Sequence, residues 1–265
     1  MQTQLNLASR IQIVTLETGA WRAQKLNRAE SHEVNKKHGT GDAAKVIVQL
    51  TDHPALLALY KLHAEAYGEH RRITLPSIQD GMRIVPTGKQ IDHAKIISEF
   101  RAKHDSLVGQ FMPDYPTLRA DAPIKLNGLH DASKWPEPSV VAGKFLFSVR
   151  YLPCPSDGAW GDWLNETAEA GQAELRERLV TAARHLADTL KGDGKLFQSA
   201  LDNLKDICDL SGEGFNLLDD PIIARAAREL RPLSIHTADA LRDAKAVRKS
   251  TGEQISNILG VLKLA

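Results

Sequence analysis

Residues 145–190 read FLFSVRYLPCPSDGAWGDWLNETAEAGQAELRERLVTAARHLADTL, and the spacing of the apolar residues changes within them. From 145 to 151 apolar and polar residues alternate, which is the period of a β-strand. From 160 to 190 apolar residues return every three or four positions, which predicts one long helix that Ser156-Asp157 can cap. The chain therefore combines strand and helix periods in one sequence.

A β-hairpin is predicted at residues 73–86, ITLPSIQDGMRIVP, because two short β-rich runs flank the turn-forming pair Asp80-Gly81. The aliphatic run at 10–16 predicts a further strand. The run at 45–50 predicts another, although its pattern does not distinguish a strand from the start of a helix. Residues 21–40 are polar and basic with few apolar positions. For this segment a second strand, a short helix and a mobile arm remain alternatives.

Two helices are predicted in the first half of the chain. One starts at Pro54, with either Thr51 or Asp52 as its cap, and its apolar residues continue at helical spacing to Tyr67. The other covers residues 92–111 on an apolar stripe, and Pro113 predicts its end. Prolines recur over residues 113–138, which predicts a long loop or a lid.

The predicted fold class is α+β. A small, mainly antiparallel sheet with packed helices is expected in the mixed region 1–155, which holds the hairpin and the proline-rich loop. The region 156–265 is expected to be helical, with one long helix, and the two regions either form separate domains or one continuous domain. Shorter helices are predicted at 195–210, 221–231, 235–248 and 251–263.

The composition and the N-terminal sequence limit the classes of protein to which the chain can belong. Hydrophobic residues make up 42% of the 265, and no run approaches the roughly 18 apolar residues of a membrane span. The N-terminal MQTQLNLASRIQIV lacks the pattern of a secretory signal, so we expect a cytoplasmic protein, in the host cytoplasm if it is phage-encoded. The two cysteines, Cys154 and Cys208, are expected to be reduced structural thiols.

Charge is unevenly distributed along the chain. Residues 1–150 carry 20 Lys and Arg against 15 Asp and Glu, a net +5, which leaves 14 against 18, a net −4, for the rest. This asymmetry favours an anionic partner for the first half. The residues expected to follow a phosphate backbone are Arg22, Lys25, Arg28, Lys36 and Lys37 in the polar arm, with Arg71, Arg72, Arg83 and Lys89 around the hairpin.

Aromatic side chains near these cations, Trp21, Tyr67 and Trp135, are candidates for stacking on unpaired bases. The alternative for the whole set is an ordinary solvated face. A second basic cluster, Arg242, Lys245, Arg248 and Lys249, is expected to be helix surface only.

Motifs for catalysis or cofactor binding are not found. The chain contains no phosphate loop, dinucleotide fingerprint, nucleophile elbow or HExxH helix, so no cofactor is predicted. His63 and His70 lie seven residues apart and can face His93 or His104, but a zinc site needs further ligands, and we expect no metal. Adjacent carboxylates precede Pro221, where helix capping explains them better than acid–base chemistry.

Four segments carry a family resemblance: TLPSIQDGMRIVP (74–86), ISEFRAKHDSLVGQFMPDYPTL (97–118), FLFSVRYLPCP (145–155) and LLDDPIIARAARELRPL (217–233). In their order and spacing the chain resembles uncharacterised phage and prophage proteins. That family is related in pattern to a domain of unknown function often encoded beside MoxR-type AAA+ ATPases and von Willebrand factor A proteins. The resemblance implies a binding or assembly role and gives no catalytic residue.

The sequence thus leads to three hypotheses. The first is a non-enzymatic, homo-oligomeric phage-type protein that binds nucleic acid, single strands in particular, for annealing or recombination; an Arg71→Glu, Arg72→Glu variant should then lose binding. The second is an adaptor for an AAA+ partner or a host defence or repair factor. The third is an enzyme using the histidine-rich region, which metal analysis of the purified protein would test.

Overall fold

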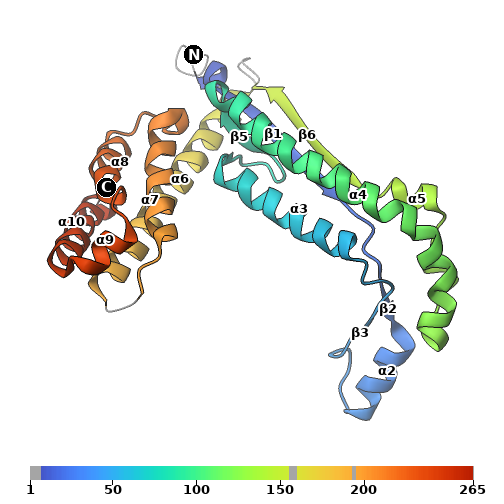
Figure 1. Cartoon of the computed structure of the whole chain (residues 1–265). Helices are drawn as coiled ribbons and strands as arrows, with labels where there is room; N and C mark the ends of the chain where they lie inside the picture. Colours follow the sequence, from blue (N-terminus) through green and yellow to red (C-terminus); the bar gives the residue numbers. More distant parts are fainter. Residues whose placement is uncertain (1–6, 155–159, 193–194, 265) are drawn as a thin grey trace. The chain divides into compact units, whose positions relative to one another are not determined.

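The computed structural model describes residues 7–154, 160–192 and 195–264, and it confirms the α+β class (Figure 1). The predicted cap at Ser156-Asp157 lies outside these residues. The larger sheet has the strand order β4-β5-β1-β6. Its strands are β4 (Leu75–Pro76), β5 (Arg83–Pro86), β1 (Ile11–Gly19) and β6 (Leu146–Pro153).

The predicted hairpin is confirmed by the antiparallel pairing of β4 with β5, which places Leu75 opposite Ile84. Gly81 in the turn has a φ of 78°, a conformation that glycine adopts without a steric cost. β5 also pairs antiparallel with β1, where Ile13 lies opposite the same Ile84. The buried aliphatic side chains of three strands therefore meet on one face.

Residues 21–40, for which the sequence leaves a strand, a helix and a mobile arm as alternatives, contain both a strand and a helix. β2 (Gln24–Asn27) leads directly into α2 (Arg28–Lys37), and the chain returns as β3 (Val46–Gln49), which pairs antiparallel with β2. The strand expected at 45–50 is confirmed. We call residues 24–49 the β2–α2–β3 module.

The helix expected to end at Pro113 was predicted wrongly. α3 (Pro54–Arg72) begins at Pro54 as expected, but α4 (Gln90–Leu126) continues through three prolines, 113, 116 and 123. The proline-rich segment is therefore no long loop. After α4 it forms the 3-10 turns Asn127–Leu129 and Ala132–Lys134 and the short helix α5 (Pro138–Ala142).

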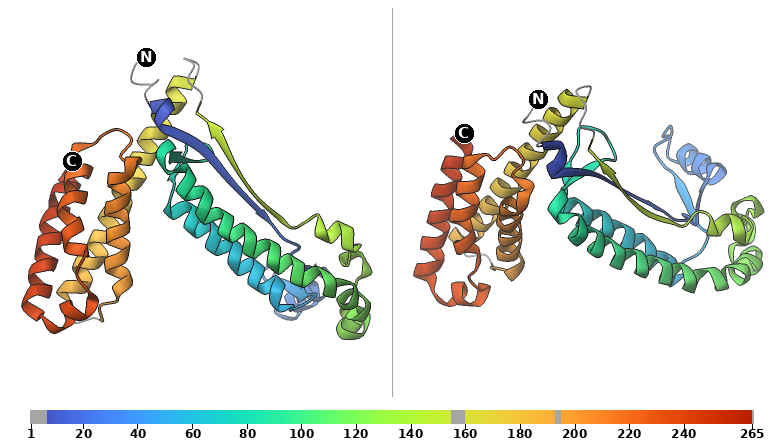
Figure 2. Two further views of the ribbon diagram at one scale, coloured as in Figure 1. Left: turned by 45° about the horizontal axis from the view of Figure 1, so that its top comes forward. Right: turned by 90° about the horizontal axis from the view of Figure 1, so that it is seen from above.

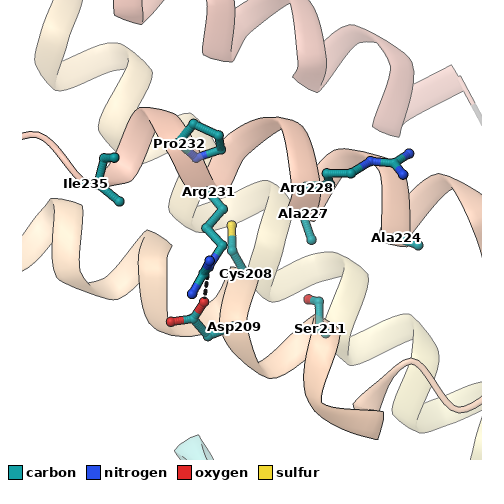
Figure 3. A pocket seen from close by; sticks show the side chains of 10 residues that line it. Cys208, Asp209, Ser211, Ala224, Ala227, Arg228, Arg231, Pro232 and Ile235 are labelled. Carbon is teal, nitrogen blue, oxygen red and sulfur yellow. Dashed lines mark hydrogen bonds and ion pairs between the residues drawn. The ribbon is translucent and has the colours of Figure 1, made fainter.

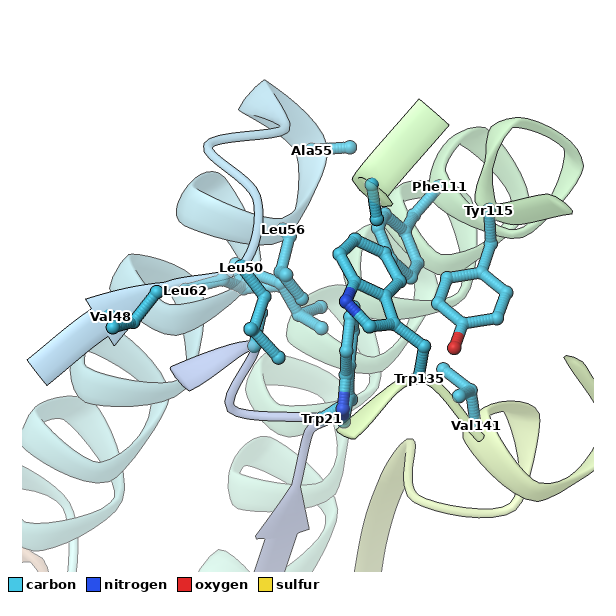
Figure 4. Close-up of a cluster of buried hydrophobic side chains, with 13 residues drawn as sticks. Trp21, Val48, Leu50, Ala55, Leu56, Leu62, Phe111, Tyr115, Trp135 and Val141 are labelled. Carbon is cyan, nitrogen blue, oxygen red and sulfur yellow. The ribbon is translucent and has the colours of Figure 1, made fainter. Parts of the chain in front are cut away.

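Burial of aromatic side chains explains why α4 continues. Phe111 and Tyr115, on either side of Pro113, are almost fully buried against Trp21 and Trp135 (Figure 4). The Trp21 ring lies 5.2 Å from Tyr115 and 5.5 Å from Trp135 between centroids. Each such side chain gains on the order of 2–3 kcal/mol on burial, comparable with the roughly 3 kcal/mol that a proline costs inside a helix.

The helical region contains α6 (Gly161–Lys191), α7 (Gln198–Leu210), a π-helical turn (Ser211–Phe215), α8 (Pro221–Ser234), α9 (Ala238–Asp243) and α10 (Lys245–Leu264). The long helix predicted at 160–190 is confirmed as α6. It packs against α7 and α10, and α8 packs against the same two helices (Figure 2). Asp220 caps α8 as expected, accepting hydrogen bonds from the backbone of Ile222 and Ile223.

The last two helices differ from the prediction of 235–248 and 251–263. α9 ends before Ala244, and one helix, α10, covers the rest. The guanidinium of Arg248 donates to the carbonyls of Thr189, Leu190 and Gly192, so it fixes the first turn of α10 to the end of α6. This long-range contact favours a helix start before residue 248.

By its internal contacts the chain divides into two compact units. The first comprises residues 1–15, 70–94 and 150–265, and the second comprises 16–69 and 95–149. The first unit thus takes segments from both sides of residue 155, because β1, α3, α4 and β6 each contribute residues to both units.

Candidate functional site

The nine cations predicted to contact phosphate fall in different units. Arg22, Lys25, Arg28, Lys36 and Lys37 belong to the second unit, and Arg71, Arg72, Arg83 and Lys89 belong to the first. Their electrostatic surroundings differ as well. The two groups are therefore separate candidate surfaces.

In the first unit, two arginines cap the end of α3. Arg178 donates to the carbonyls of Arg71 (2.8 Å) and Thr74 (3.1 Å), and Arg83 donates to the Thr74 hydroxyl at 2.6 Å. Both guanidiniums also bind the carboxylate of Glu174, at 3.3 Å from Arg83. These cations satisfy carbonyls that a helix C-terminus leaves unpaired.

The other first-unit cations are also close to carboxylates. Arg72 lies 3.1 Å from Asp206, and Lys89 lies 3.4 Å from Asp92. A cavity of about 520 Å³ beside Arg71 and Arg72 is lined as well by Glu174, Glu177 and Arg178. Its charges are mixed, so this surface offers an anion little net attraction.

The β2–α2–β3 module of the second unit is held together by polar contacts. The buried Ser31 hydroxyl donates to the Asn27 carbonyl (2.6 Å) and accepts from Val46 N (2.9 Å). The buried Asn35 amide bonds both backbone groups of Ala44, at 2.8 and 2.9 Å. The inward face of α2 therefore joins β3 through hydrogen bonds.

An Asn35→Ala variant should loosen this module. Alanine favours a helix more than asparagine, so any loss of order must come from the missing hydrogen bonds. We expect amide hydrogen exchange in residues 28–46 to accelerate about tenfold, with the aromatic core unchanged. Exchange measured by mass spectrometry tests this, with His32→Ala, on the exposed face of α2, as the control. Equal protection in both variants would contradict the structural role of Asn35.

The module and the residue positions just before it carry a net positive charge, although Glu30, Glu33 and Asp42 lie in the same segment. Residues 21–50 contain six Lys and Arg against three Asp and Glu. Within the described residues, no ion pair or hydrogen bond involves the side chains of five exposed cations: Arg22, just before the module, and Arg28, Lys36, Lys37 and Lys45 within it. These charges are available to a ligand, whereas among the predicted first-unit cations Arg72, Arg83 and Lys89 each lie close to a carboxylate. Arg71 shares its pocket with Glu174 and Glu177.

A pocket of about 660 Å³ opens where β2 enters α2. It is lined by Gln24, Lys25, Leu26, Asn27, Arg28, Asp131 and Lys134, and we call it the cationic pocket. Lys25 lies 3.7 Å from Asp131, whose pKa is held below its usual range first by the hydrogen bond from the Ser133 side chain. The pocket therefore holds three cations and one ionised carboxylate. Lys134 was not predicted, because it is distant from the arm in sequence.

The predicted stacking aromatics Trp21 and Trp135 are buried in the core and present no face to a ligand, which corrects that expectation. The hydroxyl of Tyr67 donates to the Leu16 carbonyl at 3.1 Å. The apolar side chains that the module exposes are aliphatic. Leu26 and Ile47, 44% and 52% exposed, lie directly opposite each other on β2 and β3.

The histidines of α3 and α4 form two buried pairs. In the second unit His63 stacks on His104, with ring centroids 5.3 Å apart. In the first unit His70 Nδ1 lies 2.9 Å from His93 Nε2, and the other ring nitrogen of His93 hydrogen-bonds Tyr151. Burial lowers the pKa of His63 to about 4, of His70 to about 3 and of His93 to about 4, with the neighbouring histidine adding to the effect at His63 and His70.

These three histidines are therefore neutral at pH 7. Their contacts with neighbouring side chains account for their place in the interior without a bound ligand. In the described part of the chain no group of three or more His, Cys, Asp or Glu is placed to hold a metal ion. The enzyme hypothesis gains no metal site from these residues.

A further pocket, of about 670 Å³, lies between α7 and α8 (Figure 3). Arg231 and Asp209 form an ion pair across it. Burial raises the pKa of the Cys208 thiol to about 12, so this group stays protonated and is a poor nucleophile. The pocket offers apolar surface from Ala224, Ala227 and Pro232 more than reactive groups.

The second basic cluster proves to be partly structural. Arg242 donates to the Leu196 carbonyl, and Arg248 to the end of α6, whereas Lys245 and Lys249 are exposed. The helices in the described residues include none with the length and apolar character of a membrane span. In comparisons with known proteins, the chain matches no family model, no curated protein and no solved structure, so the phage-family resemblance stays a prediction.

Proposed function

We propose that this protein binds nucleic acid through the β2–α2–β3 module. The observation that carries the proposal is the set of five exposed cations that have no carboxylate partner in the described structure. Lysine and arginine side chains that contact phosphates release counterions, which supplies most of the affinity in nonspecific binding. The proposal moves the expected contact surface away from Arg71 and Arg72.

Single strands fit this surface better than duplex. The exposed pair Leu26 and Ile47 lies on a two-stranded ribbon within the same module as the cations. Unpaired bases present apolar faces that a duplex hides in its stack. A strand whose phosphates follow the cations can therefore place bases against these aliphatic side chains.

Replacing Lys36, Lys37 and Lys45 together by glutamine should weaken single-strand binding about tenfold or more at moderate salt. The plot of log K against log salt concentration should become shallower by about 0.7 for each lost phosphate contact. Fluorescence anisotropy with labelled single-stranded and double-stranded oligonucleotides at several salt concentrations measures both quantities. Light scattering of the same samples gives the mass of the complex.

The matched control replaces three exposed lysines of the first unit, Lys205, Lys245 and Lys249, by glutamine. It changes the net charge equally and should leave the slope intact. If both triple variants lose binding alike, the effect is one of total charge and the module is not the contact surface.

A protein-adaptor role is the second candidate. It is favoured by the pocket between α7 and α8, where Ile235 is 66% exposed beside Ala227 and Pro232. Absence of oligonucleotide binding by the parent chain at low salt would make this the stronger candidate.

A further inference from the structure

The cationic pocket differs from an open basic surface in that its charges converge on one hollow. Lys25 and Arg28 come from the start of the module, and Lys134 comes from the 3-10 turn that lies beyond α4. With Asp131 counted, the pocket carries a net charge of about +2 at pH 7. It therefore concentrates positive charge at one place beside the module.

The carboxylate of Asp131 lies in the wall of the pocket and contacts Ser133 and Lys25. One of its carboxylate oxygens accepts hydrogen bonds from the backbone and hydroxyl of Ser133, at 3.0 and 2.7 Å. Its other oxygen faces Lys25, whose side chain is only 11% exposed. The carboxylate is thereby occupied by the protein, and Arg28 and Lys134 are left to face a ligand.

Charge complementarity selects the ligand. A phosphodiester within a strand carries a charge of −1, whereas a terminal phosphomonoester carries about −1.5 to −2 at pH 7. The net charge of the pocket matches the monoester. Its volume of about 660 Å³ lies within the range of small-molecule sites, roughly 300–1,000 Å³, and exceeds what a bare phosphate fills.

The remaining lining suits a nucleotide attached to that phosphate. Gln24 and Asn27 supply amide groups, and Leu26 supplies an apolar face. We propose that the cationic pocket receives the phosphorylated terminal nucleotide of a nucleic-acid strand, an assignment that rests on the proposed nucleic-acid binding. The exposed cations of α2 then contact the next phosphates of the strand.

The test compares one oligonucleotide in three forms, with a 5′-phosphate, with a 3′-phosphate and with hydroxyls at both ends. One phosphorylated form should bind the 265-residue chain about tenfold more tightly than the hydroxyl form. Lys134→Gln should remove this preference, so that the phosphorylated and hydroxyl forms bind the variant with nearly equal affinity. Lys134 is exposed, so the variant should fold, which circular dichroism checks. Lys144→Gln, another exposed lysine of the second unit, is the control and should keep the preference.

Each outcome separates this inference from the proposal it rests on. Equal, salt-dependent binding of all three forms would overturn the pocket assignment and leave nucleic-acid binding standing. Failure of every form to bind at low salt would overturn both. Competition by a nucleoside monophosphate as strong as that by the phosphorylated strand would overturn the strand end as the ligand, because the free nucleotide would then suffice.

Discussion

A Glu174→Gln variant is expected to lose about 2 kcal/mol of unfolding free energy. The Glu174 carboxylate holds the guanidiniums of Arg83 and Arg178, which are 15% and 19% exposed. Without its charge, two neighbouring cations remain near each other with no anion between them. The loss stays below the roughly 3–5 kcal/mol typical of a fully buried pair, because Glu174 is one-third exposed.

Urea unfolding followed by circular dichroism measures this loss. The midpoint should fall while the dependence on urea concentration is unchanged. Glu177→Gln is the matched control, since it makes the same chemical change at an exposed position on the same helix and should cost less than about 0.5 kcal/mol. Equal midpoints for the two variants would show that Glu174 contributes nothing beyond surface charge.

Acidification from pH 7 to pH 4 is expected to destabilise the protein through its buried histidines. In the folded state the pKa values of His63, His70 and His93 are lowered to about 4, 3 and 4, whereas an unfolded chain has the ordinary value of about 6.5. Below pH 6.5 the unfolded chain therefore binds more protons than the folded one. The contribution of these histidines to the unfolding free energy is fully present above that pH and is lost as the pH drops towards 4. For His63 alone the loss is on the order of 2 kcal/mol.

Unfolding by urea at pH 7, 5.5 and 4.5 tests this dependence. A His63→Gln, His104→Gln variant removes the stacked pair of the second unit and should show a smaller loss of stability on acidification. Phe147→Leu alters the packing against the same pair without changing a titrating group, so it should lower stability by a similar amount at each pH. A histidine variant with the parent's pH dependence would exclude this pair as the cause.

Local sequence patterns predicted most strands and the long helix α6, because those elements follow their own period. They failed at Pro113, where the local rule ends a helix. Here the helix continues because Phe111 and Tyr115 are buried against Trp21 and Trp135. These two tryptophans lie far from Pro113 in the sequence. A window of about a dozen residues, the usual span of a periodicity rule, does not contain that contribution to stability.

The candidate site could likewise be predicted only in part, because the partners of its charged residues lie far away in the sequence. The sequence indicates which residues are basic but not which are paired. Glu174 lies 91 positions from Arg83, and Asp206 lies 134 from Arg72, so the compensation of the first-unit charges depends on the fold. Lys134 joins Lys25 in the cationic pocket for the same reason.

The hydrogen-bonded interior of the β2–α2–β3 module has a thermodynamic consequence. Exposure of apolar surface raises the heat capacity of unfolding, by about 0.45 cal/K/mol per Å², and exposure of polar groups lowers it. Ser31 and Asn35 form the buried face of α2, so local opening of this helix carries a small heat-capacity change. The free energy of opening should therefore vary almost linearly with temperature. The free energy of unfolding of the aromatic core should instead follow a curve with a maximum.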